Sequence, residues 1–400
     1  MRKKINQRVY LDHAAATPLD SRVFKATQSF LKNNFGNPSA LYKSGRIARD
    51  ILKASRENVS KILHCKPEEI IFTSGGTESD ALALLGVMRK SNGQHLITSK
   101  IEHPAVLNNA KKLEKEGVDV TYLNVSAEGF IDLKKLEKSI KPETTLVSIM
   151  YANNEIGSIQ PIKEISKIIK KYRAKNNLKT PFLHTDACQA AGYLDINVQK
   201  LGIDLMTINS SKIYGPKGAG ILYKKQGIDV EPLWEGGGHE NRLRSGTENM
   251  AGIVGFAEAL KIVEKNKLSE SKRLIKLSDY FIKNLFEKVP NLIFNGPKIN
   301  RLPNNINISI MDIEGESMLL YLDRYGIEVS TGSACDSQNL DPSHVILALG
   351  KPHEVAHSSI RFTLGRNTKK KDIDYVLKII PKVAETLRKI SPIYGKEKNK

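Results

Sequence analysis

The sequence predicts an α/β protein with a large domain, built on a mostly parallel sheet that helices cover, and a smaller α+β domain. Runs rich in Val and Ile alternate with helical patterns along the first half of the chain, which is typical of parallel sheets buried on both faces. The chain has 400 residues, more than one hydrophobic core usually supports. A long helical pattern at 251–289 precedes a region without that alternation. We therefore expect residues 20–262 to form the large domain, and residues 1–19 with 263–400 to form the small one.

The expected elements follow from the spacing of apolar residues. Apolar residues at helical spacing predict helices, and short β-branched runs between turn residues predict strands. In the first part of the chain we expect strands at 9–12, 69–73, 95–98, 118–125, 145–150 and 205–208, another from 182, and helices at 21–31, 45–63, 81–88 and 162–171. After the long helix we expect strands at 304–310, 326–330 and 359–364, and helices at 317–324 and 371–390.

Four polar side chains fall at the C-terminal ends of these strands: His103, Asn154, Asp186 and Lys212. Ligands gather at this edge of open parallel sheets. Lys212 follows the apolar run 205–208 and precedes a turn rich in Gly and Pro. With its stem packed, desolvation can lower the pKa of its amine and make it competent to form a Schiff base. Each residue alone is more often structural, but four on one rim indicate a site.

Glycines stand between the strand at 69–73 and the next helix, in the segment Ser74-Gly75-Gly76-Thr77-Glu78-Ser79-Asp80. Backbone N–H groups exposed at such a junction bind anions. The dinucleotide fingerprint GxGxxG is absent, and a phosphate monoester fits the segment at least as well. The alternative is a plain helix start that Thr77 or Ser79 caps.

Composition limits the class of partner. The formal net charge is +19, which fits a nucleic-acid or acidic-protein partner, or a lysine-rich solvated surface. We favour the surface, because the lysines are spread along the chain and aromatic residues are only 6%. No apolar run can span a membrane and no apolar signal core follows the basic N-terminus, so we expect a cytoplasmic protein without a membrane partner or a direct nucleic-acid partner. Cys65, Cys188 and Cys335 form no CxxC pair, so we expect neither a disulfide framework nor a structural zinc site.

The segment His353-Glu354-Val355-Ala356-His357 matches the HExxH zinc signature. That signature needs a helix long enough to place both imidazoles on one face. Pro352 precedes the segment and a strand pattern starts at 359, so we expect one turn of helix leading into a strand, and no metal site.

Polar motifs recur along the chain in a fixed order. They are Phe35-Gly36-Asn37-Pro38-Ser39, Thr73-Ser74-Gly75-Gly76-Thr77-Glu78-Ser79-Asp80, Glu102-His103, Asn153-Asn154-Glu155-Ile156-Gly157, Asp186-Ala187-Cys188-Gln189, Lys212-Ile213-Tyr214-Gly215-Pro216-Lys217-Gly218, Arg244-Ser245-Gly246-Thr247 and Gly332-Ser333-Ala334-Cys335. With these motifs the chain resembles the pyridoxal-phosphate-dependent cysteine desulfurases of the class V aminotransferase family, from Tyr10 to Arg366. The resemblance implies the fold-type-I architecture of pyridoxal-phosphate transferases.

The resemblance also implies residue roles. Lys212 would hold pyridoxal phosphate as a Schiff base and later move the α-proton of the substrate, while Asp186 would pair with the pyridinium nitrogen. His103 would stack on the ring and take part in catalysis. Arg361 would clamp the substrate carboxylate, and Cys335 would attack the sulfur. Further contacts would come from Asn154 and Gln189 beside the phenolic oxygen, Asn154 at the substrate, Gly76, Thr77, Asn209 and Ser211 at the phosphate, and Thr247 across a homodimer interface.

The implied reaction takes sulfur from L-cysteine, releases L-alanine and leaves a persulfide on Cys335 for acceptor proteins in iron–sulfur cluster assembly or tRNA thiolation. The segment 335–342 is similar to the long-loop branch of the family, and a loop thiol can collect sulfur and then swing outward. Alternatives are a selenocysteine lyase, a related pyridoxal-phosphate lyase or aminotransferase, and a catalytically weakened sulfur-relay scaffold. Cys335 argues against an aminotransferase, and the intact set of motif residues argues against the scaffold.

The chain departs from the family near the lysine. Asn209 and Ser211 replace the usual Ser and His, and Tyr42 stands where a histidine is common. The segment Asn241-Arg242 replaces the usual Arg-Gly. Since Asn and Ser still donate hydrogen bonds, we expect weaker or rearranged phosphate binding rather than none.

Overall fold

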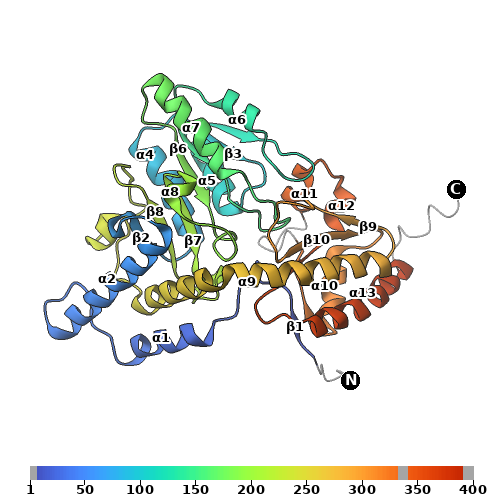
Figure 1. The fold of residues 1–400 in the computed structure, drawn as a ribbon. Helices are drawn as coiled ribbons and strands as arrows, with labels where there is room; N and C mark the ends of the chain where they lie inside the picture. The colour runs from blue at the N-terminus through green and yellow to red at the C-terminus, as the bar shows by residue number, and fades with distance from the viewer. Residues whose placement is uncertain (1–6, 332–340, 391–400) are drawn as a thin grey trace.

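The computed structural model describes residues 7–331 and 341–390 (Figure 1). Within them, a seven-stranded sheet has the order β2-β8-β7-β6-β5-β3-β4. All neighbouring strands are parallel except β8, which is antiparallel to both β2 and β7. The expected mostly parallel sheet is therefore confirmed. Its strands are β2 (Ile70–Thr73), β3 (His95–Ser99), β4 (Asp119–Leu123), β5 (Thr144–Ser148), β6 (Phe182–Asp186), β7 (Leu205–Asn209) and β8 (Gly220–Lys224).

Successive residues of these strands contribute to two different hydrophobic cores, one on each face of the sheet. Val147 and Met206 pack into one core, whereas their neighbours Leu146 and Leu205 pack into the other. Side chains that alternate across a strand explain why both faces are apolar. The first core includes residues of α2 (Lys43–Leu63), α7 (Ile162–Asn176) and α9 (Met250–Lys288), and the second includes residues of α3 (Gly76–Ala81), α4 (Val87–Lys90) and α5 (Pro104–Lys115).

The described residues beyond 288 form a second, antiparallel sheet of three strands in the order β12-β10-β9. A core of its own fills the space between this sheet and the helices, with Phe281 packed edge-on against Phe362 at 5.2 Å. The elements are β9 (Leu292–Phe294), β10 (Asn305–Ile310), α10 (Gly315–Asp323), β11 (Ile327–Glu328), α11 (His344–Ala348), α12 (His353–His357), β12 (Ser359–Thr363) and α13 (Lys370–Ile390). The N-terminal β1 (Val9–Tyr10) pairs with β11 in parallel, so the first residues join the C-terminal part of the chain.

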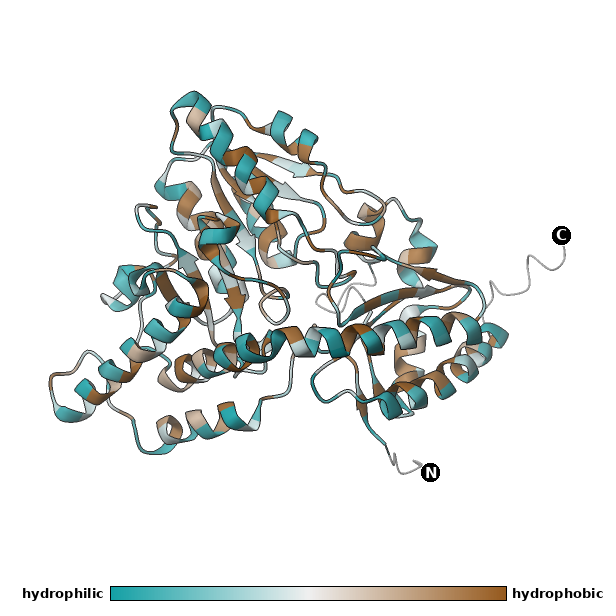
Figure 2. Ribbon diagram, viewed as in Figure 1, coloured by the Kyte–Doolittle hydropathy of each residue, from teal (hydrophilic) through white to brown (hydrophobic). Residues whose placement is uncertain are grey.

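Helix α9 is 39 residues long and passes from the large sheet to the second sheet (Figure 1). Its Val263 belongs to the core of the large sheet and its Leu274 to the core of the second sheet. Figure 2 shows α9 and α13 alternating between hydrophilic and hydrophobic residues along their length, as expected for helices with one packed face. The boundary at residue 262 stays a prediction.

The structure differs from the sequence-based expectation beside the glycines. The expected helix at 81–88 instead begins at Gly76, and Gly75 is its N-cap residue. The alternative that Thr77 or Ser79 caps the helix is therefore wrong. The helix start was misplaced because the residues of its first turn are small or polar, so the hydrophobic periodicity begins only after them. Strand β8 and helix α5 were also missed, and both lie beside residues of the site.

Candidate active site

Lys212 ends a short 3-10 turn, Ser210–Lys212, that directly follows β7. Its Nζ donates to the carbonyl oxygens of Ala14, at 2.9 Å, and Ala15. Gln189 Nε2 donates to the same Ala14 oxygen at 2.9 Å. A loop near the N-terminus thus holds the amine at the C-terminal edge of the large sheet, next to the strand that ends at Asp186.

Asp186 is the last residue of β6 and is 7% exposed, with Oδ1 accepting from the Cys188 amide at 2.8 Å. His103 is the N-cap of α5, and its Nδ1 accepts from the Ala105 amide at 3.1 Å. Burial lowers the pKa of His103, the charge of Asp186 opposes this, and Lys212 lowers it further. His103 is therefore a neutral imidazole, close enough to Asp186 and Lys212 for their charges to affect its pKa. The structure brings these predicted residues to one place.

Arg361 lies on β12 and is 3% exposed. Its Nη2 donates to Asp12 Oδ1 at 2.8 Å, and its Nη1 donates to the Asn154 carbonyl oxygen at 3.1 Å. Its Nε is buried and has no hydrogen-bond partner among the described residues. Arg361 also lowers the pKa of His103, so it lies on the same side of the site. A buried donor of this kind suits an anionic ligand, such as a substrate carboxylate.

The segment 74–77 lies close against the residues that end β7 and follow β6. This segment is called the glycine cup below. A Cβ built on Gly76 would stand 3.0 Å from Cys188 Sγ and 3.6 Å from Asn209 Nδ2. A side chain at this position would crowd Cys188, so glycine suits the close approach of the backbone. Asn209 Oδ1 accepts from the amide and hydroxyl of Ser211, at 3.1 and 3.2 Å, so Asn209 turns its amide nitrogen toward the cup. Thr77 follows Gly76 with an exposed side chain.

Two carboxyl groups that sequence reasoning did not single out lie behind Asp186. Asp80 and Glu102 are 1% and 0% exposed, and burial is the main cause that raises the pKa of each, helped by Asp186. Asp80 Oδ1 lies 3.6 Å from His184 Nε2. Glu102 accepts from the Met150 amide at 3.0 Å and from Ser99 Oγ. Asp80 and Glu102 are parts of quoted motifs, which was the signal that could have marked them.

Replacing Glu102 with glutamine is expected to flatten the pH dependence of stability. Burial raises the pKa of Glu102 from 4.5 to about 8, so the folded chain keeps a proton that the unfolded chain loses. Its contribution to the free energy of unfolding therefore falls as pH rises from about 4.5 to about 8. Between these pH values the melting temperature should fall less steeply for Glu102→Gln than for the wild type. Equal slopes would contradict the raised pKa of Glu102.

The roles of two predicted site residues, Cys335 and Thr247, stay predictions. Cys335 lies outside the described residues. Thr247 is exposed on the loop that follows the short turn His239–Arg242, and no interaction of the described residues joins its side chain to Lys212. The role implied for Thr247 involves a second copy of the chain, so the arrangement within one chain does not test it.

The residues present fit pyridoxal phosphate. They offer an amine at Lys212, a buried carboxylate at Asp186 for a ring nitrogen, an imidazole at His103, and a glycine cup with a hydroxyl at Thr77 for a phosphate. The unpartnered Nε of Arg361 adds a donor for a carboxylate. This donor set is the one that this cofactor and an amino-acid substrate require.

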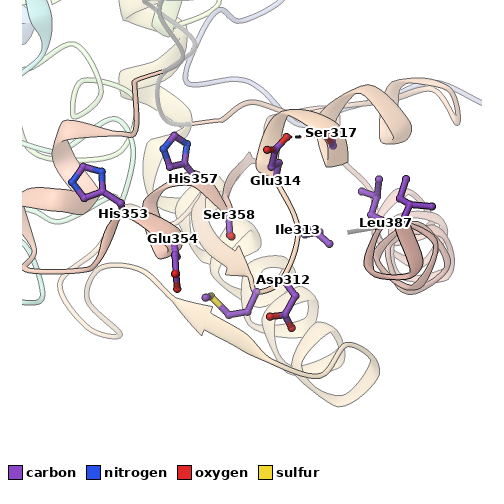
Figure 3. A pocket seen from close by; sticks show the side chains of 11 residues that line it. Asp312, Ile313, Glu314, Ser317, His353, Glu354, His357, Ser358 and Leu387 are labelled. Atoms are coloured by element: carbon purple, nitrogen blue, oxygen red, sulfur yellow. Dashed lines mark hydrogen bonds between the residues drawn. The ribbon is translucent and has the colours of Figure 1, made fainter. Parts of the chain in front are cut away.

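The HExxH segment lies elsewhere, on α12, which is one turn of helix leading into β12 as predicted. His353, Glu354 and His357 line a separate cavity of about 480 Å³. Figure 3 shows their side chains pointing in different directions around it. Among residues 7–331 and 341–390, no three His, Cys, Asp or Glu side chains are grouped so that they could hold a metal ion. A zinc centre therefore gains no support.

None of the helices within residues 7–331 and 341–390 combines the length and the apolarity that crossing a membrane requires.

The chain matches known proteins over almost its full length. The family model for Aminotransferase class-V matches residues 9–376. Cysteine desulfurase IscS from Dictyoglomus turgidum is 49% identical over 390 residues, which are 97% of this chain and 97% of the relative. A solved structure of a NifS-like protein has a TM-score of 0.88 at 35% identity and covers 95% of this chain and 100% of its own. A structure of SspA in complex with cysteine has a TM-score of 0.78 at 33% identity and covers 89% of this chain and 98% of its own.

These matches agree with the site geometry and with the fold. The parallel sheet, the lysine after β7 and the carboxylate at the end of β6 all lie inside the matched range. The chain therefore belongs to the aminotransferase class-V family, and within it to the pyridoxal-phosphate-dependent cysteine desulfurases.

Proposed function

We propose that this enzyme removes sulfur from L-cysteine and passes it to acceptor proteins, with the site residues acting as follows. The observation that carries the proposal is the assembly of Lys212, Asp186, His103 and Arg361 from four distant segments at one edge of the large sheet. The family relatives named cysteine desulfurase support it, as does the relative solved with cysteine.

Arg361 binds and orients the substrate through its carboxylate. Its two terminal nitrogens are already held by Asp12 and the Asn154 carbonyl, so the guanidinium is fixed before substrate arrives. A donor held in advance loses little conformational entropy on binding. The backbone carbonyl of Asn154 accepts a hydrogen bond from Arg361. This contact supports the predicted place of Asn154 at the substrate.

Lys212 would hold the cofactor through its amine and would then move the α-proton of the substrate. Bound pyridoxal phosphate supplies an electron sink for breaking bonds at the substrate carbons. Asp186 would hold a proton on the ring nitrogen, and His103 would cover the ring. Gln189, whose Nε2 donates to the Ala14 carbonyl, would contact the side of the ring that carries the phenolic oxygen. Gly76, Thr77, Asn209 and Ser211 would hold the phosphate; Gly76 lies close to Asn209, which bonds Ser211.

Cys335 completes the reaction. Its thiolate attacks the sulfur of the bound cysteine, the C–S bond breaks, and the sulfur remains on Cys335 as a persulfide. The carbon gains a proton and leaves as L-alanine. The persulfide then passes to an acceptor protein of iron–sulfur cluster assembly or tRNA thiolation. We further propose that residues 20–262 form the large domain that binds the cofactor. Residues 1–19 and 263–400 form the small domain that contains the Cys335 loop.

The chain works as a homodimer in which Thr247 of one copy contacts the phosphate of the other. The exposure of Thr247 supports this, because a residue with that task must lie on the surface of a single copy. We also propose a cytoplasmic location. The described cysteines, Cys65 and Cys188, are both thiols rather than a disulfide, which suits a reducing compartment.

The direct test is to incubate the purified protein with L-cysteine and a reductant and to measure sulfide and alanine. The Cys335→Ala variant is expected to lose sulfide formation by about a hundredfold or more, because it lacks the thiol that accepts the sulfur. Cys188, the described thiol beside Gly76, is a poor substitute, because burial raises its pKa. The Cys335→Ala variant should still bind the cofactor at Lys212.

The matched control is Cys65→Ala, which removes a half-buried thiol whose pKa burial raises to about 12. This variant should form sulfide at the wild-type rate. Equal losses in both variants, or wild-type protein that forms no alanine, would contradict the proposed function.

A further inference from the structure

A partly buried ion pair lies beside the glycine cup. Glu78 stands in the first turn of α3, and its side chain is 6% exposed. Its Oε2 accepts from the Ser74 amide at 2.7 Å, and its Oε1 accepts from Arg244 Nε at 3.0 Å. Arg244 belongs to the loop that also carries Thr247. One carboxylate therefore joins the cup to a loop from a distant part of the chain.

The position of Glu78 poses an electrostatic problem for phosphate binding. The carboxylate directly follows Gly76 and Thr77 in the sequence and bonds the amide of Ser74 on the other side of the cup. A negative charge close to a phosphate dianion repels it, and solvent screens the repulsion less because the Glu78 carboxylate is buried. Arg244 supplies the opposite charge at hydrogen-bond distance.

The loop that delivers Arg244 is anchored independently of the cup. Glu240 is 7% exposed and accepts from Arg56 Nη1 at 2.9 Å and from the Phe72 amide at 2.7 Å. Glu240, Asn241 and Arg242 have φ angles of 46°, 57° and 65°. Left-handed conformations are costly for non-glycine residues and persist only where the surroundings enforce them. The anchor therefore fixes the path of the loop toward Glu78.

We propose that Arg244 is a positioning residue that neutralises Glu78, so that the cup at Gly76 and Thr77 accepts a phosphate dianion. The inference rests on the proposed function, because it requires the cofactor phosphate to bind at this cup. Neither side chain is assigned a contact with the reacting atoms.

The test is the affinity of the full-length apo-protein for pyridoxal phosphate alone, measured by absorbance titration without substrate. Arg244→Gln is expected to weaken binding by about tenfold or more, because it leaves the carboxylate unpaired beside the phosphate. The double variant Glu78→Gln, Arg244→Gln should recover most of that loss. Glu78→Gln alone should bind at least as tightly as the wild type, and Arg244→Lys, which keeps the charge, should stay within about threefold of it.

The double variant shows whether Arg244 acts by neutralising Glu78. If it binds as weakly as Arg244→Gln, Arg244 acts on the phosphate directly or on the fold, and the proposal is overturned. If the wild type binds no pyridoxal phosphate, the proposed function fails as well. If the wild type binds it but the double variant does not recover the affinity, only this inference is overturned.

A matched control separates charge at the cup from general loss of stability. Asp204 accepts from the Leu183 amide at 2.9 Å and pairs with Arg173, which is the same chemistry at the other end of β6 and β7. Arg173→Gln should lower the melting temperature and leave the affinity for pyridoxal phosphate unchanged. A loss of affinity equal to that of Arg244→Gln would overturn the proposal.

Discussion

Replacing Lys212 with arginine is expected to lower the rate of alanine formation from L-cysteine by about a thousandfold or more. Arginine keeps the positive charge near the Ala14 and Ala15 carbonyls, so the fold around β7 should persist. Its guanidinium cannot form the covalent bond to the cofactor or take the α-proton, because it does not deprotonate in proteins. Steady-state alanine formation with saturating pyridoxal phosphate measures the effect.

The control for this variant is Lys267→Arg. Lys267 is another buried lysine, 9% exposed, and its Nζ donates to the Leu194 carbonyl at 3.3 Å and to Glu264 at 2.7 Å. The proposed mechanism does not use it, so the rate should stay close to that of the wild type. A Lys212→Arg enzyme with near wild-type activity would contradict the assigned role of the amine.

Replacing Arg361 with lysine is expected to raise KM for L-cysteine by about ten- to a hundredfold, the loss expected for one charge-assisted hydrogen bond. Lysine has one ammonium group and cannot bond Asp12, the Asn154 carbonyl and a substrate carboxylate together with the geometry of the guanidinium. The effect should appear mainly in KM, because the interaction orients the substrate before and during the reaction.

Arg273→Lys is a suitable comparison, because Arg273 also bonds a carboxylate, Glu270, and a backbone carbonyl, that of Thr368 at 2.7 Å. It has no assigned contact with substrate, so this change should leave KM for L-cysteine unaltered. If Arg361→Lys changes only the melting temperature and not KM, Arg361 is structural and the carboxylate must bind elsewhere.

Much of the site could be predicted because it follows strand ends. Asp186 is the last residue of β6, and Lys212 ends the short turn that follows β7. Parallel strands bring their C-terminal ends to the same edge of a sheet. The long helix α9 was also evident, since its apolar residues repeat at helical spacing over 39 residues. Local pattern was enough wherever burial repeats with the period of the element.

The rest depends on contacts between residues far apart in the chain. Arg361 pairs with Asp12 across 349 residues, and Arg244 reaches Glu78 across 166 residues. Neither pairing leaves a local pattern. The start of α3 was misplaced for a related reason, because a polar first turn at Gly76 is stabilised by tertiary contacts and carries no apolar repeat.

Reductive trapping tests the central assignment most directly. The holoenzyme is treated with tritiated borohydride, digested, and its labelled peptide is sequenced. The chemistry assigned to the sheet edge predicts that the label is on the peptide containing Lys212, in an amount that matches the bound cofactor. Label on a different lysine, or none on this peptide, would contradict the assignment.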